Sequence, residues 1–179
     1  QACTESEIQI TDVITELEKS SNSSNYAIPV NYDCFSLVQL SDYIVNTHHS
    51  YVQKNLPYIR AYAEKVMKVH GNRHPELLPI YQLVEEVNAE LTAHMVKEEK
   101  VLFPYIKELV ASSKNAQPLH AAHFGSVQNP INMMEMEHEM VGKNLAQIRE
   151  LTNNYSLPED ACASYNLLYR MLDEFEEDL

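Results

Sequence analysis

A histidine and a glutamate four residues apart, His94 and Glu98, are the strongest candidates for chemistry in this sequence. Four residues of an α-helix turn through about 400°, so both side chains leave the same face, one turn apart. An imidazole and a carboxylate placed in this way can bind one metal ion, or the carboxylate can bridge two. A surface ion pair has the same spacing. The apolar run that follows, residues 101–103, favours a buried pair, and buried ionisable groups need a partner such as a metal.

Two further histidines lie on apolar helical faces elsewhere in the chain. His49 follows Val45 by four residues and precedes Val52 by three, which predicts an inward-facing side chain. Its neighbour His48 points about 100° away, so we expect it outward or beside the site. His138 lies among methionines at helical spacing. At each position alone, a hydrogen-bonded histidine in an ordinary core is the alternative interpretation.

Taken together, one histidine on each of three successive helices predicts the wall of a metal site inside a bundle. Imidazole with carboxylate, and without thiolate, favours iron or manganese. Glu137 and Glu135 lie close to the third histidine in sequence and are candidates for supporting the site or lining a path to it; exposed surface is the alternative. His70 follows His49 by 21 residues, about 31 Å along a helix, so it is predicted to be a loop or helix-end residue outside the site.

The pattern of apolar residues predicts the elements that must position these side chains. Apolar residues recur at three- and four-residue spacing over residues 36–69, 75–111 and 130–153, and a fourth helix is expected to begin near Pro158. Three glycines in 179 residues argue against hairpins and phosphate-binding loops. The predicted fold is all-α: an antiparallel up-down four-helix bundle.

Composition excludes several classes of function. A net charge of −13 and a pI near 4.9 argue against binding to nucleic acid or to an anionic membrane. The sequence has no run of 18 apolar residues, so it predicts no membrane span. Cys3, Cys34 and Cys162 form neither a disulfide framework nor a zinc motif, so a reduced, cytoplasmic setting is expected.

Three stretches of the sequence resemble the Repair of Iron Centres proteins, a hemerythrin-like di-iron family of bacterial nitrosative and oxidative stress. The matching residues are 40–57, 93–104 and 130–142. The resemblance implies a hemerythrin-like bundle holding two non-haem iron ions. It also implies metal-binding histidines at the three positions singled out above, a bridging carboxylate from the glutamate, and an acidic residue beside the third histidine: His49, His94, His138, Glu98 and Glu137.

The resemblance also implies how the chain is organised. Residues 1–24 are similar to the end of the family's small cysteine-containing N-terminal domain followed by a polar linker, and residues 25–179 to its di-iron domain. The family has a further His and Glu, four residues apart, at a place that would follow Leu179. The last helix is therefore expected to be truncated, the ligand set for two irons incomplete, and the open groove a site for dimerisation or helix exchange.

The resemblance implies repair of damaged iron–sulfur clusters, with damaged iron–sulfur proteins as partners. Donation of a labile iron and reduction of nitric oxide at the two irons are both compatible with the sequence, so it does not decide whether the protein is an enzyme. A hemerythrin-like carrier or sensor of O₂ or NO is a second class, and a metal-free bundle for protein contacts is a third.

Overall fold

The structure, a computed structural model, describes residues 31–115 and 124–179. Backbone contacts divide the chain into two units, Gln1–Phe35 and Ser36–Leu179. In the first unit, Tyr32–Cys34 form a short 3₁₀ turn (η1), capped by the side chain of Asn31, which accepts the backbone N–H of Asp33. The predicted N-terminal element of residues 1–24, and the boundary after it, lie outside the described residues.

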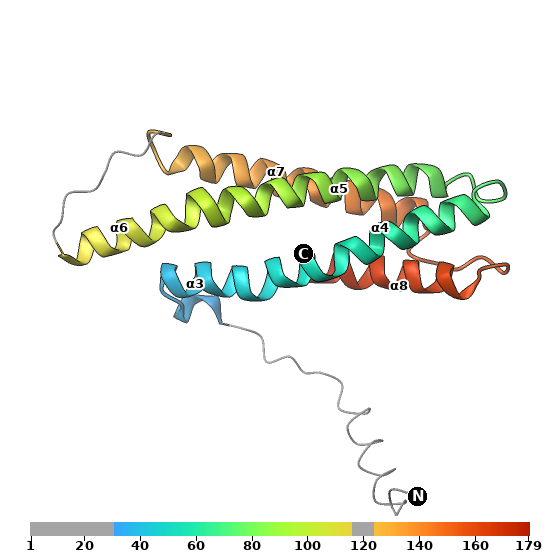
Figure 1. The fold of residues 1–179 in the computed structure, drawn as a ribbon, viewed down its shortest axis with the longest axis horizontal. Helices are drawn as coiled ribbons and strands as arrows, with labels where there is room; N and C mark the ends of the chain where they lie inside the picture. The colour runs from blue at the N-terminus through green and yellow to red at the C-terminus, as the bar shows by residue number, and fades with distance from the viewer. Residues whose placement is uncertain (1–30, 116–123) are drawn as a thin grey trace, which may run out of the picture. The chain divides into compact units, whose positions relative to one another are not determined.

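The second unit consists of four helical rods. The first contains α3 (Leu37–Ile44), the π-helical segment η2 (Val45–His49) and α4 (Ser50–His70); the second contains α5 (Leu77–Lys97), the π-helical segment η3 (Glu98–Leu102) and α6 (Phe103–Asn115); α7 (Gln128–Leu151) and α8 (Ala163–Asp178) complete the set. Figure 1 shows successive rods running in opposite directions. The predicted all-α, antiparallel four-helix bundle is confirmed. None of the described helices is long and apolar enough to cross a membrane.

The first rod begins with a capping box. The Ser36 side chain accepts the backbone N–H of Gln39, and the Gln39 side chain accepts the backbone N–H of Ser36. Two of the free amides at the helix start are thereby satisfied, which contributes about 1 kcal/mol to the helix. The start of α3 is therefore fixed two turns before η2, the segment that carries His49.

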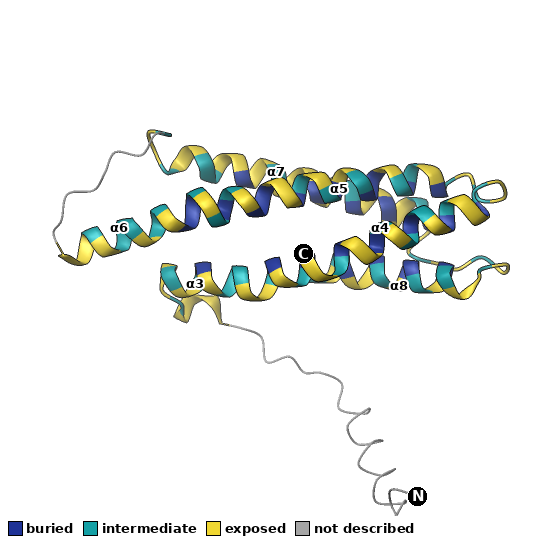
Figure 2. Ribbon diagram, in the orientation of Figure 1, coloured by how far each residue is buried: buried dark blue, intermediate teal, exposed yellow. Residues whose placement is uncertain are grey.

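Two hydrophobic clusters hold the rods together. α5 packs against α4 and α7, and α4 packs against α8. The larger cluster lies among these four helices and includes side chains with no exposed surface, such as Ile148, Tyr165 and Leu168. The smaller cluster consists of Leu102, Phe103 and Met134, with partly buried neighbours from α3, η2, α6 and α7. Figure 2 shows buried and exposed residues interleaved along the rods, as amphipathic helices require.

The start of the last helix differs from the sequence prediction. The prediction placed it near Pro158, whereas α8 begins at Ala163. Asp160 is held outside the helix by ion pairs with Arg73 and His74 from the loop after α4. Cys162 then precedes the helix in an extended conformation. Long-range ion pairing has therefore overridden a local helix-start pattern.

Candidate metal centre

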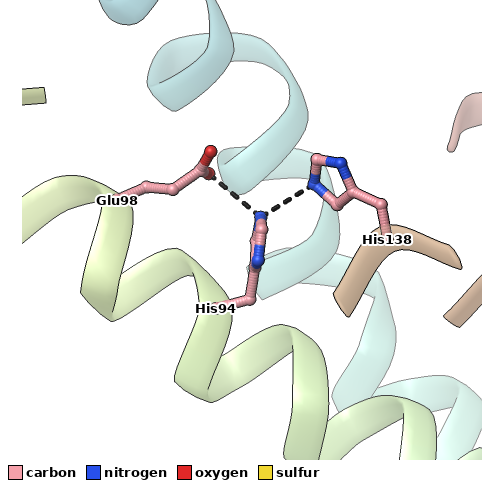
Figure 3. A group of neighbouring side chains, drawn as sticks. All are labelled: His94, Glu98 and His138. Carbon is pink, nitrogen blue, oxygen red and sulfur yellow. Dashed lines mark hydrogen bonds and ion pairs between the residues drawn. The ribbon is translucent and has the colours of Figure 1, made fainter. Parts of the chain in front are cut away.

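Three potential metal ligands from two rods converge inside the bundle. The ligand atoms of His94, Glu98 and His138 all lie within 4.8 Å of one another. Figure 3 shows the imidazole of His94 between the other two side chains. His94 and Glu98 are buried, whereas His138 is exposed, so the cluster has a closed side on α5 and η3 and an open side on α7. The predicted HxxxE pair and the third histidine are thus brought together.

The carboxylate of Glu98 extends the cluster to the first rod. Its Oε2 lies 2.9 Å from Nε2 of His49 and 3.3 Å from Nε2 of His94. Nε2 of His94 lies in turn 2.8 Å from Nε2 of His138. One carboxylate oxygen therefore lies between the imidazoles of His49 and His94, and the third imidazole, that of His138, contacts the second.

The outward nitrogens of two rings are bound by further carboxylates. Nδ1 of His49 is 2.9 Å from Oε1 of Glu99, and Nδ1 of His94 is 2.9 Å from Oε2 of Glu137. Glu137 also pairs with Lys97. Because an ionised carboxylate only accepts hydrogen bonds, each Nδ1 must carry the proton. A neutral imidazole in that tautomer presents a lone pair at Nε2, which is the state a metal requires.

This proton arrangement tests whether a cation fits. With Nδ1 protonated, the Nε2 lone pairs of His49 and His94 face an acceptor oxygen of Glu98 at hydrogen-bond distance. Acceptor facing acceptor in a buried site is unfavourable unless a positive charge lies between them, supplied either by protons on the rings or by a metal ion. The donor set is therefore complementary to a cation.

The pKa shifts of the cluster also indicate that positive charge is favoured beside Glu98. Burial by itself would lower the pKa of His49 and of His94, but hydrogen bonds with the neighbouring glutamates outweigh burial and raise both pKa values. Burial would raise the pKa of Glu98, but its hydrogen bonds with the two histidines lower it to about 2. Burial and the charge of His94 lower the pKa of His138. The glutamate is thus an anion at neutral pH, and His138 offers a neutral nitrogen.

A cavity of about 540 Å³ opens beside the cluster. Its wall includes all four predicted ligands together with apolar residues of α4, α5 and α7 and the last turn of α8. There Oδ2 of Asp178 is buried without a hydrogen bond and lies 3.5 Å from Nδ1 of His48. Phe103, which is not among the residues of this wall, stacks on the ring of His49, with centroids 6.0 Å apart. The cavity therefore gives small ligands a route to the cluster, along a wall that contains both polar and apolar groups.

Both rods that carry buried ligands depart from α-helical geometry at the cluster. η2 ends at His49, and η3 begins at Glu98. A π-helical turn holds one more residue than an α-helical turn, and such turns are frequent at functional sites. The wider turn allows Glu98 and its neighbour Glu99 to contact the same imidazole, one at each nitrogen.

The structure places the predicted residues as follows. His49 faces inward and His48 is half-buried beside the cavity, while Glu137 contacts His94. Glu135 is exposed on α7, outside the group of converging ligand atoms. Sequence reasoning missed Glu99 and Asp178. A second acid directly after a candidate ligand was a signal for Glu99, but nothing near Asp178 distinguishes it from the other acids of the last helix.

Comparison with known proteins agrees with this geometry. The hemerythrin HHE cation-binding domain matches residues 41–179. A probable iron–sulfur cluster repair protein of Haemophilus influenzae is 32% identical over 166 residues, which are 93% of this chain and 67% of that protein. The iron–sulfur cluster repair proteins YtfE of Yersinia pseudotuberculosis and Yersinia pestis are 34% identical over 143 residues, which are 80% of this chain and 59% of theirs. The chain thus spans about two thirds or less of the length of these relatives.

The matched domain covers every residue of the cluster, and the resemblance to cluster-repair proteins is confirmed by relatives above 30% identity. The chain belongs to the hemerythrin HHE cation-binding family.

Proposed function

We propose that this chain is the iron-binding bundle of a protein that repairs iron–sulfur clusters damaged by nitrosative or oxidative stress. The observation that carries the proposal is a buried carboxylate oxygen of Glu98 in contact with two imidazole nitrogens, with the nitrogen of a third imidazole, His138, beside that of His94. Imidazole and carboxylate donors suit non-haem iron. The proposed role in cluster repair rests on the similarity to relatives named iron–sulfur cluster repair proteins.

Each residue of the cluster has a separate task in this proposal. His49, on one side of Glu98, and His94 with His138, on the other, would hold two iron ions, and the carboxylate of Glu98 would bridge them. Glu99 and Glu137 keep the Nδ1 protons of His49 and His94 in place, so that the Nε2 lone pairs point inward. Bound there, iron supplies Lewis acidity and one-electron chemistry.

Iron donation is the activity that the geometry favours. His138 is exposed and the cavity reaches solvent beside it, so an iron ion held by His94 and His138 has a short exit. We therefore propose a damaged iron–sulfur protein as partner and labile iron as the transferred substrate. A cytoplasmic setting belongs to the proposal, since the thiols of Cys34 and Cys162 are free.

Reduction of nitric oxide, or reversible binding of NO or O₂, is the second candidate. The cavity beside the cluster has a mainly apolar wall, with Val52, Leu91 and Val141 among its residues. Such a wall admits small neutral ligands. Nitrous oxide formed from NO and a reductant would favour reduction, whereas a stable optical band without consumption of the gas would favour a carrier.

Iron content and iron transfer test the leading proposal. Purified under anaerobic conditions and loaded with Fe²⁺, the chain is expected to bind iron, and Glu98→Gln and His94→Ala are expected to lose most of it. Glu86→Gln, an exposed acid on α5, serves as the matched control. The loaded protein should reactivate a hydratase whose iron–sulfur cluster lacks one iron. Binding that is unaffected by the first two variants, or a loaded protein that restores no activity, contradicts the proposal.

A further inference from the structure

A cysteine and a histidine form a pair at the end of the bundle opposite the metal centre. Sγ of Cys162, directly before α8, lies 3.2 Å from Nε2 of His70, the last residue of α4. His70 follows His49 by 21 residues on one rod, so about 31 Å separates this pair from the cluster. The cysteine is exposed, whereas the histidine is only 5% exposed. A buried imidazole therefore contacts the sulfur of a cysteine that is exposed to solvent.

The imidazole of His70 is held rigidly and is not hydrogen-bonded on its other side. The ring of Tyr165 meets it edge-on, with centroids 5.3 Å apart, and His74 lies 6.4 Å away. Within the described part of the chain, Nδ1 of His70 is buried and has no hydrogen-bond partner. An unpaired buried N–H costs about 1–3 kcal/mol, and unpaired buried donors are rarer than unpaired acceptors. The proton therefore belongs on Nε2, which donates to the sulfur of Cys162.

The backbone around Cys162 adds a second source of positive potential. The residue occupies the N-cap position of α8, a helix of 16 residues, in an extended conformation with φ −81° and ψ 171°. Its side chain makes no capping hydrogen bond, so the sulfur is not engaged by the first turn. The partial positive charge of a helix N-terminus stabilises an anion at that place. The N–H of His70 thus contacts the sulfur of Cys162, and the N-terminal end of α8 begins directly after this residue.

We propose that Cys162 is a reactive thiol that forms mixed disulfides with low-molecular-weight disulfides, with His70 as its positioning residue. The thiol releases its proton to solvent, and the Nε2–H of His70 donates to the resulting thiolate. The thiolate attacks one sulfur of the small disulfide, a new sulfur–sulfur bond forms, and the old one breaks. The leaving thiolate takes up a proton from water. Cys162 is oxidised and the small disulfide is reduced, so no other oxidant is needed.

The surroundings distinguish this residue from a cysteine that only fills space. A structural cysteine is buried and inert, whereas Cys162 is an exposed residue. Cys34 offers a comparison within the same chain: it is also exposed and free, and within the described residues it is not paired with a histidine. A mixed disulfide at Cys162 would place a charged group at the junction of α4 and α8, far from the iron ligands. The site is independent of the proposed iron chemistry.

Alkylation rates measured on the full chain test the proposal. Iodoacetamide is added at pH 7, and labelling of the peptides that contain Cys34 and Cys162 is followed by mass spectrometry. Cys162 is expected to react about tenfold faster than Cys34, and the difference should vanish in urea. In His70→Phe the rate at Cys162 should fall to that of Cys34 at pH 7, yet match the wild type at about pH 9.5, where thiols are ionised without assistance.

The comparison of the two cysteines needs no variant, so a misfolded His70→Phe protein does not weaken the test. His70→Gln, whose amide can still donate a hydrogen bond, should retain part of the rate. Incubation with oxidised glutathione should add one glutathione to Cys162 first, reversibly with dithiothreitol. Equal rates at Cys34 and Cys162 in the folded wild type, or an unchanged rate in folded His70→Phe at pH 7, overturns the proposal.

Discussion

His49 and Glu98 lie in two different π-helical segments, and Nε2 of the first is 2.9 Å from Oε2 of the second. The two widened turns face each other at one level of the bundle. Successive residues in a wide turn diverge less than in an α-helix. Glu98 and Glu99 can therefore bind one imidazole from two sides, which fixes both its orientation and its tautomer.

Removing the outer carboxylate should weaken iron binding without removing a ligand. In Glu99→Ala the ring of His49 loses the acceptor for its Nδ1 proton, so we expect iron affinity to fall by about 10–100-fold. Glu99→Gln should recover part of the loss, because its amide oxygen can accept the same proton. Competition with a chromogenic chelator measures the affinity. Glu135→Ala, exposed on α7, is the control, and equal affinity in the two alanine variants would refute the assigned role.

The widened turn of η3 can be tested by deleting one residue. Deletion of Lys100, which is exposed, would convert the π turn to α-helical spacing while the residues after it keep their places. Glu98 and Glu99 could then no longer both contact the imidazole of His49, so we expect loss of bound iron, with helical circular dichroism largely retained. The substitution Lys100→Ala is the matched control and should leave both properties unchanged. A deletion variant that binds iron normally contradicts a requirement for the π turn.

The larger cluster should dominate stability. Ile148 has no exposed surface, so Ile148→Ala removes buried methyl groups and leaves a cavity. We expect a loss of about 2–5 kcal/mol in the free energy of unfolding, measured by urea denaturation. Val69→Ala, at a position that is 63% exposed, should change it by less than about 0.5 kcal/mol. Similar losses at both positions would mean that the packing described for α7 is wrong.

The junction between α4 and α8 should make stability depend on pH. A hydrogen bond with Asp160 raises the pKa of His74 above 6.5, and the same bond lowers the pKa of Asp160 below 3.8. Glu76 also pairs with His74, and Arg73 with Asp160. The stabilisation from His74 is complete below pH 6.5 and is lost as pH rises through its raised pKa. That from Asp160 is present above pH 3.8 and is lost as pH falls through its lowered pKa.

His74→Gln should therefore melt below the wild type by the widest margin between about pH 4 and 6.5, and the gap should narrow above neutrality. Thermal melts at several pH values measure it. Lys143→Gln breaks a fully solvent-exposed ion pair with Glu139 and is the control, with little effect at any pH. A gap that widens as pH rises through 8 has the wrong sign for a protonated histidine and would exclude this assignment.

The sequence was sufficient to predict the helices that carry the site. Periodic apolar residues mark the rods, and the HxxxE spacing places His94 and Glu98 on one face. Both features depend only on residues that are close in sequence, so they can be recognised without knowing the fold. The resemblance to a di-iron family implied four ligand residues, and in the structure their side chains lie close together.

The details that sequence reasoning missed depend on contacts between distant segments. The sequence predicts that the fourth helix begins near Pro158, but partners 86 and 87 residues away hold Asp160 in a turn. The π segments carry no marker of their own, since their residues also suit an α-helix. His70 is the last residue of α4, as predicted, yet its partner Cys162 lies 92 residues further along the chain and could not be identified from spacing.

The residues of the candidate metal centre form a polar layer between two hydrophobic clusters of unequal size. The larger cluster contains most of the apolar packing of the described residues, whereas the buried members of the smaller one are Leu102, Phe103 and Met134. The end of the bundle with the smaller cluster can therefore open locally while the end with the larger cluster stays folded. Amide hydrogen exchange at the smaller cluster should follow this local opening instead of global unfolding. A cation bound at the candidate metal centre would tie both ends together. Metal release would then depend on local unfolding as well as on ligand chemistry. The same local opening that loosens the helices around the smaller cluster would also let the ion leave.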